Sequence, residues 1–155
     1  MTFKTDALQR YVSWQCYGCG KCNEKGLLAE TVKVADGYLC EWDTVEDHVA
    51  HPGKYHHGVI TTICFCHGAW AATAERYAAE NKALADPLEY FYVNQRIVYD
   101  ILKPIKLNAT ASILAKVTLD APESVQVDFE ISVDGDLCAT ATTRLKKVDA
   151  TEMAF

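Results

Sequence analysis

Ionisable side chains gather between residues 44 and 55, a segment that the sequence predicts to be a loop. Glu46 and Asp47 stand directly before His48. A carboxylate can orient an imidazole, so Asp47 beside His48 is a pair that could perform acid–base chemistry. Acidic side chains in loops are also commonly solvated without any role, and the sequence leaves both interpretations open. Asp47 is therefore a candidate catalytic residue.

The cysteines, of which the chain has seven, are a second group of reactive side chains. Their number is odd and no secretory signal is visible, so we expect reduced thiols. Cys16, Cys19 and Cys22 form a C-x₂-C-x₂-C segment, whereas zinc sites commonly pair two C-x₂-C units. We expect a tight, glycine-shaped turn with buried thiols and no metal. A zinc site could in principle be completed from further along the chain, by Cys64, Cys66 or His67.

Cys66 is also a candidate nucleophile, because a helix dipole can activate a thiol. His67 follows it in the sequence. Adjacent residues of a helix point about 100° apart, so these two side chains do not face each other. A buried cysteine is also commonly inert packing, and the sequence leaves this alternative open.

The elements that position these residues begin with one long helix, predicted from Gly58 to Asn81. Its first turns are apolar or small on almost every face. A helix that is apolar on every face is buried on every face. The rest of the chain must therefore supply a sheet that wraps around it.

That sheet is predicted from segments in which apolar and polar residues alternate, the pattern of a half-buried strand. Asp36-Gly37 and Asp134-Gly135 are hairpin turn signals. No strand–helix–strand alternation follows the long helix, which favours an antiparallel sheet. A short helix from Asp6 to Trp14, capped by Asp6, is expected before it. The predicted strands cover residues 27–34, 38–43, 88–102, 109–119, 125–133 and 137–145.

Length and charge limit the classes of protein. A chain of 155 residues fits a single domain, with its core at about 26–147 and an N-terminal helix and Cys/Gly-rich segment at 1–25. The net charge of −6 and the lack of a Lys/Arg cluster argue against nucleic-acid binding. No apolar run reaches the ~18 residues of a membrane span, and no signal peptide is visible. We expect no membrane contact and a cytoplasmic location.

Three segments resemble the hot-dog fold acyl-CoA thioesterases related to the phenylacetate-pathway thioesterase. The resemblance spans roughly residues 15 to 147. It implies an α+β hot-dog fold, in which a curved antiparallel sheet wraps a long central helix, assembled as a homodimer or a dimer of dimers. It also implies an acyl-CoA or related thioester as ligand and no cofactor. The segments are Cys16-Tyr17-Gly18-Cys19-Gly20 with Asn23 and Gly26-Leu27, Pro52-Gly53-Lys54-Tyr55-His56-His57-Gly58-Val59-Ile60, and Leu102-Lys103-Pro104 with the Asp134-Gly135 hairpin.

The resemblance also implies roles for the residues where the helix begins. Free N–H groups at a helix N-terminus can hold a thioester carbonyl and its oxyanion. The implied catalytic residues are His57 and His56, with Asp47 and Cys66 as further candidates. The implied substrate-binding residues are Gly58, Val59, Phe65, Asn94 and Arg96.

One feature of these thioesterases is missing from the sequence. The enzymes carry a catalytic carboxylate on the helix. At the matching position this chain has Phe65 or Cys66, and its helix has no carboxylate before Glu75. Three hypotheses follow. The first is a thioesterase with non-standard catalytic residues, and the second is an acyl-CoA binder without catalysis. The third is a hot-dog dehydratase or hydratase that uses a loop histidine, since His51-Pro52-Gly53 loosely resembles a loop of those enzymes.

Overall fold

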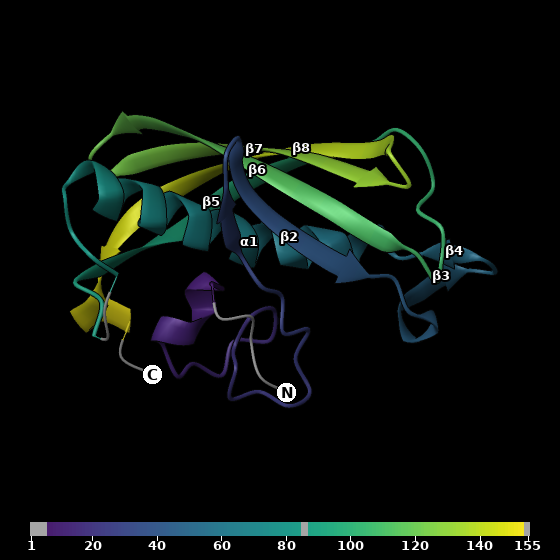
Figure 1. The fold of residues 1–155 in the computed structure, drawn as a ribbon, viewed down its shortest axis with the longest axis horizontal. Helices are drawn as coiled ribbons and strands as arrows, with labels where there is room; N and C mark the ends of the chain where they lie inside the picture. The colour runs from purple at the N-terminus through teal and green to yellow at the C-terminus, as the bar shows by residue number, and fades with distance from the viewer. Residues whose placement is uncertain (1–5, 85–86, 154–155) are drawn as a thin grey trace.

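One antiparallel sheet forms the larger layer of the molecule in the computed structural model, which describes residues 6–84 and 87–153 (Figure 1). Six strands lie in the order β1-β2-β6-β7-β8-β5, so β5 forms one edge. All the neighbouring pairs are antiparallel. The strands are β1 (Val32–Val34), β2 (Gly37–Asp43), β5 (Tyr90–Ile101), β6 (Thr110–Ala121), β7 (Ser124–Val133) and β8 (Asp136–Asp149).

The helix α1 (His57–Ala79) crosses one face of this sheet and buries Ile60, Ile63 and Trp70 against it and the N-terminal segment. Its bounds agree with the predicted helix to within two residues. The helix ends where Asn81 takes a left-handed conformation, with φ of 55°, which is a common C-terminal arrangement for asparagine. The predicted α+β hot-dog architecture, a long central helix wrapped by a curved antiparallel sheet, is confirmed.

The N-terminal segment lies on the side of α1 away from the sheet (Figure 1). The predicted helix from Asp6 to Trp14 is wrong. A short 3-10 helix, η1 (Leu8–Tyr11), follows Ala7 without a side-chain cap. The chain leaves helical geometry at Val12, whose backbone is extended, and Trp14 packs against α1, with its ring centroid 5.6 Å from that of Trp70.

A buried hydrogen-bonded chain joins this segment to α1 and the sheet. Gln9 donates to Thr31 Oγ1 at 2.9 Å, and that hydroxyl lies 2.9 Å from Nδ1 of His67. The other ring nitrogen, Nε2, lies 3.2 Å from the carbonyl oxygen of Tyr38, which can only accept. Burial lowers the pKa of His67 to about 4, so this ring is a neutral structural group.

Two other predicted elements differ from the structure. The strand predicted at 27–34 is confined to β1, because Leu28 has a φ of 55° and the amide of Leu27 bonds to the carbonyl of Tyr17 at 2.7 Å. The predicted loop at 44–55 contains regular structure: η2 (Glu46–His48), β3 (Val49–His51) and β4 (Lys54–Tyr55). A last 3-10 turn, η3 (Ala150–Met153), follows β8.

Within the described part of the chain, none of the helices combines the length and the apolar character that crossing a bilayer requires. The longest of them, α1, holds its apolar residues against the sheet and the N-terminal segment instead.

Candidate active site at the start of helix α1

His56 caps helix α1. Its Nδ1 atom accepts a hydrogen bond from the backbone N–H of Gly58 at 2.9 Å, and its carbonyl oxygen accepts from the N–H of Val59 at 3.0 Å. Since Nδ1 accepts, the neutral ring carries its proton on Nε2. A Cβ at position 58 would lie 2.7 Å from Cε1 of the His56 ring, so this cap requires glycine there.

The pocket beside this cap, called the helix-start pocket below, has a volume of about 480 Å³. That is within the roughly 300–1,000 Å³ typical of small-molecule sites. It brings together four residues predicted from the sequence, namely Asp47, His56, Gly58 and Val59. The complete lining is Tyr17, Leu27, Asp47, His48, Val49, His56, Gly58, Val59 and Thr62.

His48 in this pocket is held by a hydrogen-bonded chain. Trp42 Nε1 donates to the hydroxyl of Tyr55 at 2.6 Å, and that hydroxyl lies 3.4 Å from Nδ1 of His48. Burial raises the pKa of Tyr55 to about 12, so the hydroxyl keeps its proton and can donate a hydrogen bond to Nδ1 of His48. With Nδ1 as the acceptor of that bond, the neutral His48 ring carries its own proton on Nε2. Asp47 is the carboxylate in the same lining.

His57 is turned away from this arrangement. Its Nδ1 lies 2.9 Å from the hydroxyl of Tyr99 on β5, and its Nε2 is buried without a hydrogen-bond partner in the described chain. Burial, together with the charge of His56, lowers the pKa of His57. Adjacent in sequence, the two histidines therefore have different surroundings, and only His56 lines the helix-start pocket.

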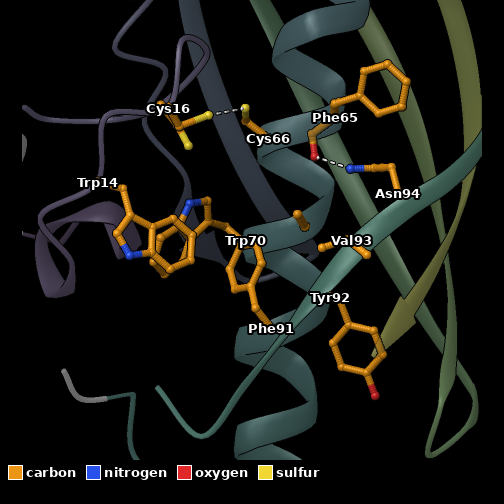
Figure 2. Close-up of a pocket in the computed structure, with 11 residues that line it drawn as sticks. Trp14, Cys16, Phe65, Cys66, Trp70, Phe91, Tyr92, Val93 and Asn94 are labelled. Carbon is orange, nitrogen blue, oxygen red and sulfur yellow. Dashed lines mark hydrogen bonds between the residues drawn. The ribbon is translucent and has the colours of Figure 1, made fainter. Parts of the chain in front are cut away.

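A second, smaller pocket of about 180 Å³ lies further along α1 and is called the helix-flank pocket (Figure 2). It brings together the predicted residues Phe65, Cys66 and Asn94. Asn94 Nδ2 donates to the carbonyl of Phe65 at 2.9 Å, and its Oδ1 accepts from Thr143 at 2.8 Å. Asn94 therefore ties helix to sheet. The lining is Trp14, Cys16, Cys19, Phe65, Cys66, Ala69, Trp70, Phe91, Tyr92, Val93 and Asn94.

Arg96, also predicted to bind substrate, lies exposed on β5 beyond a register irregularity at residues 94–96. It lines neither of the two pockets. Glu75, the first carboxylate of α1, is used structurally: it pairs with Lys33 and accepts from the hydroxyl of Tyr38 at 2.8 Å. The described helix thus offers no carboxylate to either pocket.

Three thiols meet in the helix-flank pocket. The sulfur atoms of Cys16, Cys19 and Cys66 all lie within 4.8 Å of one another, and those of Cys16 and Cys66 are 3.6 Å apart. Hydrogen bonds from Cys19 and Cys66 hold the pKa of Cys16 far below that of a free thiol, and the pKa values of both donors are raised in turn. Cys66, a candidate nucleophile from the sequence, therefore has its sulfur tied to that of Cys16, and either thiol can be the donor.

The sequence named Cys66 only as one of three residues that could complete a site with the N-terminal cysteines. The C-x₂-C spacing was the signal for Cys16 and Cys19, but the third thiol comes from a helix fifty positions away. Cys22, which extends the same motif, is exposed and stands outside the cluster.

No protein-family model matches this sequence, and no curated protein matches it. Solved structures do match its fold. They include the protein smu.793 from Streptococcus mutans bound to acetyl CoA, with 18% identity over 78% of this chain and 89% of that chain and a TM-score of 0.63. A hypothetical thioesterase from Streptococcus pneumoniae with coenzyme A matches with 18% identity over 78% and 86% and a TM-score of 0.62.

The PaaI protein of the E. coli phenylacetic acid degradation operon matches with 15% identity over 79% of this chain and 80% of that chain, and a TM-score of 0.61. Sequence identities this low establish a likeness of fold. The chain therefore has the hot-dog fold of these structures, as its one long helix on a six-stranded antiparallel sheet already indicated.

Proposed function

We propose that this protein is an acyl-CoA thioesterase whose reaction takes place in the helix-start pocket. The observation that supports this most is the presence of a carboxylate, Asp47, and an imidazole donor, His56, in one ligand-sized pocket at a helix N-terminus. Two proteins of the same fold are described with acetyl CoA or coenzyme A bound, which favours a thioester of coenzyme A as the ligand.

The proposed reaction places the thioester carbonyl oxygen at Nε2–H of His56. Asp47 takes a proton from a water molecule as the water oxygen attacks the carbonyl carbon. The negative charge that develops on the carbonyl oxygen is stabilised by the His56 donor and the positive end of the helix dipole. The C–S bond then breaks, Asp47 returns the proton to the departing thiolate, and a carboxylic acid and free thiol result.

His56 takes the role that the sequence suggested first for His57. The His57 ring bonds to Tyr99 on β5 and lies outside the pocket lining. His56, in contrast, presents Nε2 from an exposed position at the helix start. The amides of Gly58 and Val59 are both paired with His56, so the imidazole is the donor offered to a carbonyl in place of those amides.

The same pairing favours a second candidate function, which is binding of an acyl-CoA without hydrolysis. If the amides of Gly58 and Val59 stay bonded to His56, the oxyanion lacks both of these helix N-terminal donors. Binding and hydrolysis differ in their product, so one experiment separates them.

That experiment incubates the purified protein with acyl-CoAs of different chain length and aromatic character and resolves free CoA by chromatography, since the chain's own thiols would react with a thiol reagent. We expect release of CoA by the wild-type protein and loss of release in His56→Ser. Saturable binding without CoA release supports the second function. If no acyl-CoA binds or is cleaved, both proposals are wrong.

We also propose that two copies pair through β5. This strand is an edge of the sheet and hydrogen-bonds only to β8 among the described strands. It leaves Val98 43% and Ile101 60% exposed. An unpaired, partly apolar edge readily adds a strand from another chain, and a two-fold axis would bring the His57–Tyr99 pair of each copy close to that junction.

A further inference from the structure

The three thiols beside α1 have the arrangement of a metal site. Cys16 and Cys19 come from the N-terminal turn and Cys66 from the helix, and their sulfurs lie within 4.8 Å of one another. Zinc binds thiolate sulfur at about 2.3 Å in a tetrahedron, which puts neighbouring sulfurs ~3.8 Å apart. The 3.6 Å between Cys16 and Cys66 is close to that spacing.

The backbone around the cluster is shaped so that the thiols can meet. A Cβ at position 18 would lie 2.3 Å from the sulfur of Cys66, so Gly18 is what lets the turn approach the helix. The peptide also turns sharply at Gly20, where a Cβ would lie 2.3 Å from the backbone nitrogen of Cys16. These two glycines hold Cys16 and Cys19 over Cys66.

A buried indole supports the same interpretation. Trp70 is 1% exposed, and its Nε1–H has no hydrogen-bond partner among the described residues. Because Trp70 also lines the helix-flank pocket, this N–H is a donor available to a group bound in the pocket where the thiols meet.

We propose that Cys16, Cys19 and Cys66 bind one zinc ion. The described chain places no fourth cysteine, histidine or carboxylate in this group, and all three thiols line the helix-flank pocket. The fourth coordination position is therefore an exchangeable one, taken by water from the pocket. The sequence led us to expect no metal, because a second C-x₂-C unit is lacking.

The proposed zinc site lies between the two pockets. Tyr17 lines the helix-start pocket, whereas Cys16 and Cys19 line the helix-flank pocket. On the helix, Thr62 lines the first pocket and Cys66 the second, one turn later. The turn therefore forms the wall between the two pockets, and a zinc ion holds that wall against α1.

The test is the metal content of the full-length protein, purified under reducing conditions, stripped with a chelator and dialysed against zinc. We expect one zinc ion per chain by elemental analysis. Cys16→Ser and Cys66→Ser should each lose it, and Gly18→Ala should lose it as well. The matched control is Cys22→Ser, which alters the exposed cysteine of the same motif and should keep the ion.

A measurement on the wild-type chain covers the case in which a variant does not fold. Cobalt should replace zinc and give the thiolate-to-cobalt charge-transfer absorption of a sulfur-ligated site. Alkylation followed by peptide mass analysis should find Cys16, Cys19 and Cys66 protected in the zinc-loaded protein and reactive after chelation. If the reduced protein takes up no zinc, if only a Cys16–Cys66 disulfide forms, or if Cys66→Ser keeps the ion, the proposal is wrong. None of these readouts depends on thioesterase activity.

Discussion

Nδ1 of His56 accepts a hydrogen bond from the backbone N–H of Gly58 at 2.9 Å, which closes the first turn of α1 with a side chain. One imidazole thus has two functions. Its Nδ1 satisfies a helix N–H that would otherwise lack a partner, and its Nε2–H is free to meet a ligand in the helix-start pocket. These two functions can be separated by substitution.

His56→Ser should keep the cap and remove the donor, whereas His56→Ala should remove both. Serine is a good N-cap, and loss of a cap costs about 1 kcal/mol. We expect only the alanine variant to lose stability in urea unfolding, and both variants to lose about 10²–10³-fold in kcat, the usual effect of removing an oxyanion donor. If the loss of kcat followed the loss of stability across the two variants, His56 would be only a cap.

Asp47→Asn should abolish most hydrolysis while leaving acyl-CoA binding intact. The amide has nearly the shape of the carboxylate but cannot take a proton from water, and a general base contributes about 10²–10⁴-fold to the rate. The control is Glu46→Gln, one residue earlier, because Glu46 is absent from the pocket lining. Steady-state CoA release and calorimetric binding should be measured for both. Equal rates in the two variants would exclude Asp47 as the base.

The helix and most of the sheet could be predicted from the sequence because each is specified by a local pattern. The helix lacks polar faces over its first turns, and the strands at Thr110–Ala121 and Ser124–Val133 alternate without interruption. The segment before residue 32 was harder to predict. Its backbone forms hydrogen bonds between distant positions of the same segment, as from the N–H of Ala29 to the carbonyl of Gly18 at 2.9 Å. No periodic pattern of residue types indicates such bonds.

The position of the helix start could be predicted from the sequence, but which side chains line the pocket beside it could not. A pocket does lie at the helix start, but which of His56 and His57 faces it depends on where the helix begins, since neighbouring residues of a helix point about 100° apart. The thiol cluster depends on a turn meeting a helix across fifty positions. Residue types indicated the possible chemistry, whereas only the tertiary fold shows which side chains meet.

Val98→Lys should disrupt the proposed pairing through β5. The side chain is 43% exposed on the edge strand, and a charge facing its own copy across a two-fold axis repels it. We expect the wild-type protein to be dimeric or larger in light scattering and the variant to be monomeric at the same concentration. Val45→Lys, at an exposed position on another element, is the matched control. A monomeric wild-type protein would contradict the proposal.

Glu75→Gln should leave CoA release unchanged and lower stability only at neutral pH. Hydrogen bonding to Lys33 is the main cause that lowers the pKa of Glu75, and the hydroxyl of Tyr38 contributes. A carboxyl whose pKa is lower in the folded than in the unfolded chain stabilises the fold above its unfolded pKa, and this contribution disappears as the pH falls through the folded pKa. Because the pair is partly exposed, we expect a loss of less than about 1 kcal/mol.

Urea unfolding at pH 7 and at pH 3 measures this difference. The wild-type protein and Glu75→Gln should differ in unfolding free energy at pH 7, and the difference should shrink toward pH 3, because the contribution is lost as the pH falls from the unfolded pKa through the lower folded pKa of Glu75. Lys33→Met should behave in the same way, since it removes the other partner of the pair. If Glu75→Gln instead abolished CoA release with stability unchanged, the first carboxylate of α1 would be catalytic, and the assignment of the base to Asp47 would be wrong.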